Sequence, residues 1–303
     1  MSPSPTSRPT SRPVRAGMST TRKLINAAGA VHWRNLPLMI VLLGGGFVMI
    51  LPFLWMVSAS FRPIGEAYQL PPSLLPRSLD FSAYREVFRT GVPFLQMYWN
   101  SFVVAAASTA GVLLTASMAG FAFARLRFPG RGLLFGAMLI GLMVPPAMTL
   151  IPIYFGYAAV GLLDTRIGLA LPAMASTFGV YMMREFMLSQ PRELEEAAIM
   201  DGAGYWTIFW RISLPQLGPA LATLGIITFI GSWNNFVSPF VLVRSFDTMT
   251  LPVGVVALQG VMGSARLSVI MAATTMSIAP LVLVFVVAQR FIIESMTLSG
   301  VKG

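Results

Sequence analysis

The sequence has no cysteine, and only 11% of its 303 residues are charged. Without cysteine, neither a disulfide framework nor a thiolate metal site can form. Soluble domains usually carry about a quarter charged residues. A chain that is 55% hydrophobic could not cover a water-exposed surface with so few charges. The composition therefore predicts an integral membrane protein.

Patterns for catalysis and nucleotide binding are missing as well. His32 is the only histidine, and the chain contains neither H-E-x-x-H nor G-x-S-x-G. It also lacks G-x-x-x-x-G-K-[ST], the loop that cradles ATP phosphates; the terminal GVKG at 300–303 does not have that spacing. We expect no enzyme activity, no metal site and no cofactor. Any ATP that drives this protein must bind to another polypeptide.

The formal net charge of +10 does not indicate a nucleic-acid partner. The cations lie between apolar stretches and are not interleaved with aromatic residues in a stripe. Residues 1–35 are rich in Ser, Thr, Pro and Arg, which predicts a disordered tail. The apolar run begins only near Leu36, too late for a signal peptide. Whether Met1 or Met18 starts the chain stays open.

Six stretches are apolar enough, at about 20 residues each, to cross a bilayer. They are residues 36–58, 101–123, 133–157, 167–186, 219–243 and 269–293. The first three contain no ionisable residue, so they offer no proton relay. The sequence thus predicts an all-α, polytopic membrane protein with a transmembrane domain at 36–303.

The distribution of cations predicts the orientation of these spans. Of the 21 Lys and Arg residues, 14 fall on the side that holds both termini and the segment 191–215, and 7 fall on the other side. We therefore expect both termini and this segment to be cytoplasmic. The longest external loop, 59–98, is a candidate binding site for an external partner. Within it, residues 81–88 predict a short helix begun by Asp80 or Ser82.

The segment 191–215, PRELEEAAIMDGAGYWTIFWRISLP, is the one long stretch that is both acidic and helix-forming. Helix formers from Glu193 to Met200 predict a short helix, with Ser189 as its N-cap and acidic residues near its N-terminus. Gly202 is expected to end or bend this helix and to expose backbone to a partner.

This segment resembles the cytoplasmic loop of bacterial ABC importer permeases, in which EAA is followed by three residues, Gly, nine residues and I-x-L-P. Every anchor matches. Other stretches of the sequence resemble the carbohydrate-uptake branch of these permeases, the maltose-transporter-like proteins. They are Asn100-Ser101, the stretches at 125–131, 143–146, 231–236 and 251–254, and the terminal GVKG.

The resemblance implies a type I ABC importer permease in the bacterial or archaeal cytoplasmic membrane, embedded in lipid. Its implied partners are a second homologous permease, a dimer of ATP-binding subunits, an extracytoplasmic solute-binding protein and a sugar. ATP would be bound by the partner subunits. The residues implied to dock on the ATPase are Glu196, Ala197, Ala198, Asp201 and Gly202.

Two interruptions of the apolar spans are candidates for the transport pathway. Pro145 and Pro146 oppose a straight helix, and they predict either a simple kink or a bend that lines the pathway. The polar stretch in the fifth span comprises Ser232, Trp233, Asn234 and Asn235. These side chains favour either hydrogen bonding between helices within the permease pair or contact with a sugar, on whose face Trp233 could stack.

Three alternatives remain. The substrate of such an importer could be an amino acid, a peptide or a polyamine. An ion-coupled secondary carrier should show ionisable residues in its spans or inverted repeats, and neither is visible. A membrane scaffold without transport activity would not need the polar fifth span.

Overall fold

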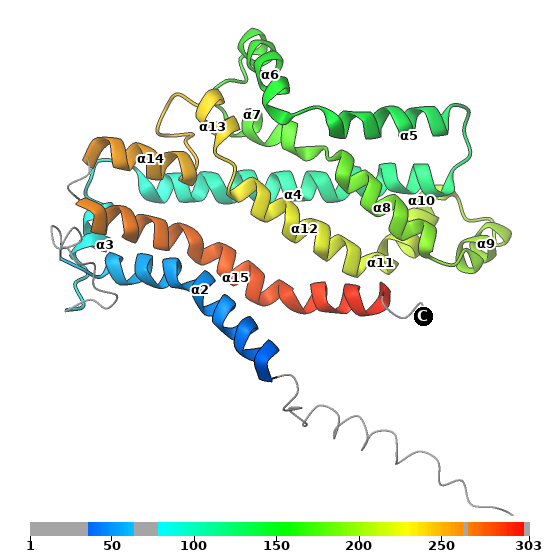
Figure 1. The fold of residues 1–303 in the computed structure, drawn as a ribbon. Coiled ribbons are helices and arrows are strands. Elements are labelled where there is room, and N and C mark those ends of the chain that lie inside the picture. Colours follow the sequence, from blue (N-terminus) through cyan, green and yellow to red (C-terminus); the bar gives the residue numbers. More distant parts are fainter. Residues whose placement is uncertain (1–35, 64–77, 263–265, 300–303) are drawn as a thin grey trace, which may run out of the picture. The chain divides into compact units, whose positions relative to one another are not determined.

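The structure is a computed structural model that describes residues 36–63, 78–262 and 266–299 (Figure 1). The predicted tail with His32, residues 64–77 of the predicted external loop and the terminal GVKG lie outside the described residues. The chain divides into two units, residues 1–54 and 55–303. The helix packing that positions the candidate site lies within the second unit.

All secondary structure in the described ranges is helical, which confirms the all-α prediction. In chain order the elements are α2 (Leu36–Ser60), α3 (Ser82–Val87), α4 (Phe94–Arg125), α5 (Arg131–Ile140), η3 (Gly141–Met143), α6 (Pro146–Val160), α7 (Arg166–Ala170), η4 (Leu171–Met174), α8 (Thr177–Ser189), α9 (Glu193–Met200), α10 (Tyr205–Ile208), η5 (Phe209–Ser213), α11 (Leu214–Gln216), α12 (Gly218–Trp233), α13 (Val237–Leu242), α14 (Leu251–Met262) and α15 (Leu267–Ser299). η5 is a π-helix, and η3 and η4 are 3-10 helices.

Three helices are long and apolar enough to cross a membrane, namely α2, α4 and α15. They correspond to the first, second and sixth predicted spans. Two bent pairs, α5–η3 with α6 and α10–α11 with α12, raise the number to at most five among the described residues. By length and composition, the described helices therefore do not establish the predicted count of six.

The third predicted span is not a straight helix, because its two halves meet at an angle of 99°. Val144 and Pro145 are both extended, with ψ angles of 118° and 132°. Each of them precedes a proline, and a residue before proline is pushed out of the helical region. Pro146 then starts α6, where its missing amide proton costs little. The interruption is a break between two helices and not a simple kink.

The fourth and fifth predicted spans are also interrupted. Residues 167–186 are divided among α7, η4 and α8, with Pro172 inside η4, because proline cannot continue an α-helix. In the fifth, α12 ends at Trp233 and α13 begins only at Val237. The sequence analysis did not predict α14, whose 12 residues are too few to span a bilayer.

Helix α4 is the element around which its neighbours are packed, with α8 and α12 lying along it (Figure 1). A Cβ atom added at Gly120 would lie 2.8 Å from Cβ of Met183, and one added at Gly111 would lie 2.4 Å from Cγ of Met174. These distances are shorter than real contacts allow. The small residues of the second span therefore permit close helix approach.

The short helix predicted at 81–88 is present as α3. The N-cap is Phe81, and Asp80 lies one residue before it, where its Oδ1 accepts a 2.7 Å hydrogen bond from the amide of Ser82. Ser82 is the first helical residue. α3 packs against α15, so the described part of the predicted external loop is held against the helical body.

Candidate functional site

The acidic segment contains the predicted helix with the predicted bounds, since α9 runs from Glu193 to Met200. The prediction that Ser189 is its N-cap is wrong. Ser189 ends α8, and its hydroxyl donates a 2.7 Å hydrogen bond to the Phe186 carbonyl. Arg192 stands at the N-cap and offers no capping acceptor. Pro191 lies before the helix and not within its first turn.

Gly202 ends α9 in the left-handed conformation, with φ of +83°. The amides of Asp201, Gly202 and Ala203 return to carbonyls of the last turn at 2.9–3.0 Å. This is a glycine-terminated helix end as predicted, because non-glycine residues are disfavoured at such φ values. A Cβ atom at Gly202 would meet nothing within 4 Å, so within this chain only the positive φ, and no neighbouring atom, favours glycine there.

The surface around Gly202 is exposed and largely apolar. Glu196, Ala197 and Asp201 are exposed and Ala198 is half-buried. Large apolar side chains that are exposed on the same segment are Leu194, Ile199, Met200, Tyr205 and Trp206. Exposed apolar surface next to charged groups is typical of a protein-binding surface. The structure thus groups the five predicted docking residues on one accessible segment.

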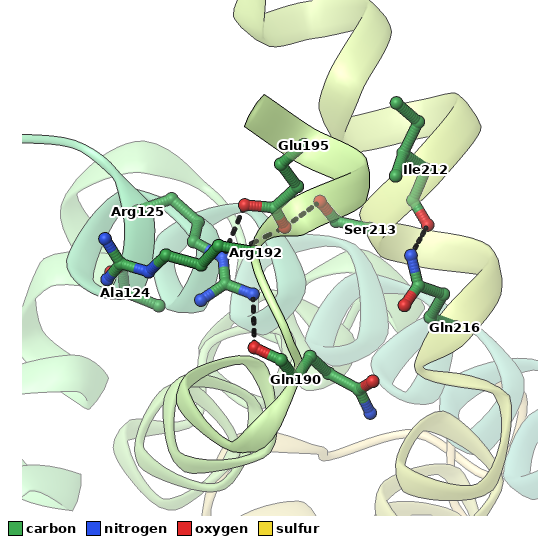
Figure 2. A network of polar contacts seen from close by, with 8 residues as sticks. All are labelled: Ala124, Arg125, Gln190, Arg192, Glu195, Ile212, Ser213 and Gln216. Carbon is green, nitrogen blue, oxygen red and sulfur yellow. Dashed lines mark hydrogen bonds and ion pairs between the residues drawn. The ribbon is translucent and has the colours of Figure 1, made fainter. Parts of the chain in front are cut away.

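Glu195, which the sequence analysis did not single out, is the buried acid of this segment. It is 8% exposed, and its carboxylate lies 2.7 Å from Nε of Arg125, as Figure 2 shows. The hydroxyl of Ser213 donates to the same carboxylate at 3.0 Å. Nη2 of Arg125 donates a 3.3 Å hydrogen bond to the Gln190 carbonyl. The only signal in the sequence was the arginine-rich stretch at 125–131, which contains no acidic residue.

The four predicted residues at the end of α12 have different environments. Ser232 and Asn235 line a cleft of about 290 Å³ between α4, α8 and α12. Asn234 is exposed and is not among the residues that line this cleft. Asn235 also accepts a 3.4 Å hydrogen bond from the amide of Ser238, in the first turn of α13. The structure therefore separates the two neighbouring asparagines by environment.

Trp233 is only 2% exposed and is held within the helix bundle. Its indole Nε1 donates a 3.1 Å hydrogen bond to the Ser277 carbonyl of α15. Its ring stacks on Phe229 and meets the edge of Tyr98. Trp233 therefore packs between α12, α4 and α15 of this chain. Pro145 and Pro146, in contrast, are exposed and do not line the cleft.

The opposite end of α4 is fixed by Asn100, which is fully buried. Its Nδ2 donates to the carbonyls of Asp247 and Met249 at 2.8 and 2.9 Å. Its Oδ1 accepts from Nε of Arg166 at 2.8 Å. The neighbouring Ser101 hydroxyl accepts from the amide of Leu251 at 2.7 Å, at the start of α14. The Asn-Ser pair therefore attaches the loop between α13 and α14 to α4.

Asp164 holds the same loop from a second side. Its Oδ1 accepts hydrogen bonds from the amides of Arg244 and Ser245 at 3.1 Å and from the hydroxyl of Thr248. Burial by itself would raise the pKa of Asp164, but the hydrogen bonds from Thr248, Arg244 and Ser245 outweigh it and lower the pKa to about 2. The carboxylate therefore remains ionised at any physiological pH.

The hydrogen bonds from Arg244, Ser245 and Thr248 to Asp164 are called the Asp164 clamp. Replacing Asp164 by Asn tests this clamp through the pH dependence of the melting temperature. Asparagine tolerates the φ of +57° found at this position, so the backbone is matched. A carboxylate with a lowered pKa stabilises the fold above its unfolded pKa of 3.8, and that stability is lost as the pH falls towards about 2. We expect the difference in melting temperature between wild type and variant to stay constant from about pH 7 to about pH 5 and to shrink only below about pH 4. A difference that disappears near neutral pH would contradict the clamp.

Comparison with known proteins identifies the family. Residues 111–297 match the family described as "Binding-protein-dependent transport system inner membrane component". The arabinooligosaccharides transport system permease protein AraQ of Halalkalibacterium halodurans is 34% identical, over 85% of this chain and 92% of that protein. The diacetylchitobiose uptake system permease protein NgcG of Streptomyces coelicolor is 33% identical, over 82% of this chain and 83% of that protein.

A solved structure agrees with these matches. A chain from a bacterial ABC transporter involved in the import of the acidic polysaccharide alginate superposes with a TM-score of 0.74 at 25% identity, over 91% of this chain and 99% of that chain. The resemblance seen in the sequence is thereby confirmed, as is the type I importer fold. The protein is a transport component and not an enzyme. The chain belongs to the family of binding-protein-dependent transport system inner membrane components, the multi-pass permease subunits of ABC importers.

Proposed function

We propose that this permease forms half of the translocation pathway of a sugar importer. It would work with a second homologous permease, an ATPase dimer that binds the ATP, and an extracytoplasmic solute-binding protein. Two similar permeases are named for oligosaccharide uptake, and the similar structure belongs to a polysaccharide importer. The observation that carries the proposal is the exposed surface around Gly202 on a segment tied by an ion pair to α4.

The exposed surface around Gly202 is proposed to dock on the ATPase from the cytoplasmic side, which the excess of cations on that side supports. Glu196 would pair with a basic or amide group of the ATPase, and Asp201 would add a weaker polar contact. Ala197 and Ala198 would let the two surfaces approach, and Gly202 would allow the closest contact. Closure of the ATPase dimer would then rock the two permeases between inward-facing and outward-facing states, so that access alternates.

The cleft lined by Ser232 and Asn235 is the proposed contact with the solute. Hydroxyl and amide groups suit a sugar, because both can donate and accept hydrogen bonds. In this proposal Trp233 supports the cleft from within the bundle, and the break at Pro145-Pro146 borders the pathway in the assembled pair.

The first test is purification of the tagged chain from its native membrane in a mild detergent. Recovery of an ATPase and a second permease is the expected result. Uptake by the reconstituted complex should require ATP, should persist when the proton gradient is collapsed, and should be competed by oligosaccharides and not by amino acids, peptides or polyamines. Uptake that follows the proton gradient at constant ATP would indicate a secondary carrier instead.

Asn235→Asp is expected to lower sugar uptake by roughly ten-fold or more, because an unpaired charge in the pathway costs desolvation that a neutral sugar does not compensate. Asp retains the oxygen that accepts from Ser238, so α13 keeps its start. Asn234→Asp, one residue away and outside the cleft, is the matched control. Equal losses in both variants, with equal membrane levels, would show that the cleft is not the solute contact.

A further inference from the structure

The first turn of α9 carries three glutamates, and they have opposite environments. Glu193 and Glu196 are exposed, whereas Glu195 is buried. Consecutive helical residues are rotated by about 100°, so these side chains leave the helix in different directions. Glu195 points inward to Arg125, and Figure 2 shows the carboxylate between this arginine and Ser213. Glu195 is therefore inaccessible to a protein that docks on the exposed face of α9.

The ion pair is well shielded from solvent at both of its ends. The side chain of Arg125 is 5% exposed and that of Glu195 is 11% exposed. Arg125 Nε approaches both carboxylate oxygens, at 2.7 and 2.9 Å. Salt weakens exposed ion pairs but reaches buried ones much less. Removal of one partner would leave a buried charge without compensation, so the contact resists separation.

Arg125, Glu195 and Ser213 form a joint at which four elements meet. Arg125 is the last residue of α4, and it also donates to the Gln190 carbonyl just after α8. Glu195 belongs to α9, and Ser213 ends the π-helix η5 that leads to α11 and α12. A π turn contains more residues than an α turn, so it changes the direction in which later side chains point; such turns occur frequently at functional sites. Here the π-helix ends at the hydroxyl that completes the joint.

Helix α4 connects this joint to a distant part of the molecule. It is uninterrupted over 32 residues, which corresponds to roughly 48 Å at 1.5 Å per residue. Its other end is attached through Asn100 and Ser101 to the loop before α14. A displacement of α9 that keeps the joint intact would therefore move α4 as a rod, and with it the loop at the far end.

We propose that Arg125, Glu195 and Ser213 form a mechanical joint that makes α9 and α4 move as one body. This inference rests on the proposed function, because it assumes that an ATPase moves α9. Glu195 is a positioning residue in this mechanism: it transmits the movement and does not itself contact the ATPase. When the carboxylate is neutralised, α9 can still dock, but its displacement is absorbed between α9 and α4.

The test compares variants of the reconstituted complex by the amount of ATP hydrolysed per solute imported. Glu195→Gln removes the charge and keeps the size, and Glu193→Gln is the matched control on the exposed face of the same helix. We expect Glu195→Gln to retain the ATPase subunits and ATP hydrolysis while uptake falls by about ten-fold or more, a loss of the order that breaking a buried pair produces. Glu193→Gln should match wild type in both readouts.

Ser213→Ala provides a milder variant if Glu195→Gln accumulates poorly. It removes one hydrogen bond and leaves the ion pair, so the ratio of ATP to solute should rise by about two- to five-fold, as expected for one lost hydrogen bond. A purely structural role would lower the melting temperature and the amount of complex but leave this ratio unchanged, and that result would overturn the proposal.

The same experiment separates this proposal from the proposed function. If Glu195→Gln loses the ATPase during purification, as a variant of the docking surface such as Gly202→Asp should, Glu195 is a docking residue and the joint is refuted. If wild type itself retains no ATPase, the proposed function fails and the joint fails with it. Retained ATPase with a raised ratio of ATP to solute supports both.

Discussion

Gly202→Asp is expected to abolish most solute uptake while the variant chain accumulates in the membrane at the wild-type level. We expect a loss of roughly ten-fold or more, because an unpaired charge would be buried in the docked surface. The structure of the chain itself gives no steric reason for misfolding, since a Cβ atom at Gly202 meets nothing within 4 Å. Uptake into membrane vesicles and co-purification of the ATPase measure the effect.

The backbone requires a separate control, because φ at Gly202 is +83°. A non-glycine residue there costs about 1–2 kcal/mol. Asn and Asp tolerate this region better than other residues, so Gly202→Asn carries the same backbone cost as Gly202→Asp without the charge. We expect Gly202→Asn to retain more uptake and more ATPase. Wild-type uptake by Gly202→Asp at normal membrane levels would refute the docking assignment.

Asn100→Ala is expected to destabilise the permease strongly, because it breaks the buried contacts at the far end of α4. Asn100 has no exposed surface, and its loss removes the partner of the Met249 carbonyl and of the Arg166 guanidinium and leaves the Asp247 carbonyl only the 3.5 Å contact from Gln96. Each buried polar group left unsatisfied costs about 1–3 kcal/mol, so a total near 3 kcal/mol is expected. The melting temperature of the purified complex should fall by roughly 6–12 °C.

Two further variants separate the contributions of Asn100. Asn100→Asp keeps the oxygen that accepts from Arg166 but replaces the donor by an oxygen that faces two carbonyls. It should therefore be at least as destabilising as Asn100→Ala. Gln96→Ala is the control, because Gln96 lies one turn earlier and its contacts are longer, at 3.2 and 3.5 Å. A melting temperature for Asn100→Ala equal to that of the control would show that the loop before α14 is held elsewhere.

These two predictions address regions that are connected through α4. The Arg125 end of α4 is joined to the acidic segment, and the Asn100 end is joined to the loop that Asp164 also holds. Both ends use buried polar contacts between residues that are far apart in the sequence. Such contacts hold a definite geometry, because a shifted arrangement would leave buried polar groups unsatisfied. The helix can therefore transmit displacement along its length.

Composition and local pattern were sufficient for the class of protein and for the acidic helix. Scarce charge and long apolar runs indicated a membrane protein, because these features follow from the solvent in which the chain resides. The bounds of α9 were predicted correctly because helix formers and the following glycine act within one or two turns. The motifs around EAA indicated the family, because several anchors match in one order and at fixed spacings.

The interruptions of the spans could be predicted only in part from the sequence. The prolines at 145 and 146 were noticed, but whether they kink a helix or divide it depends on the conformation of Val144 and Pro145. Trp233 had two interpretations, and neither indicated that its ring stacks on Phe229 and that its indole donates to the Ser277 carbonyl of the same chain. The short helix α14 was not predicted, since a 12-residue apolar helix has no signal that distinguishes it from part of a longer span.

The sequence by itself determined that this chain is a helical membrane protein with an acidic loop, because solvent preference and helix propensity are properties of nearby residues, and the resemblance around EAA indicated a permease. Only the tertiary structure decided which glutamate of that loop is buried. Glu195 and Glu196 have the same chemistry and adjacent positions; the EAA pattern marks Glu196, but no local pattern shows which of the two is buried. Their difference arises from Arg125, which lies 70 residues away along the chain and is brought to one side of α9 by the packing of α4.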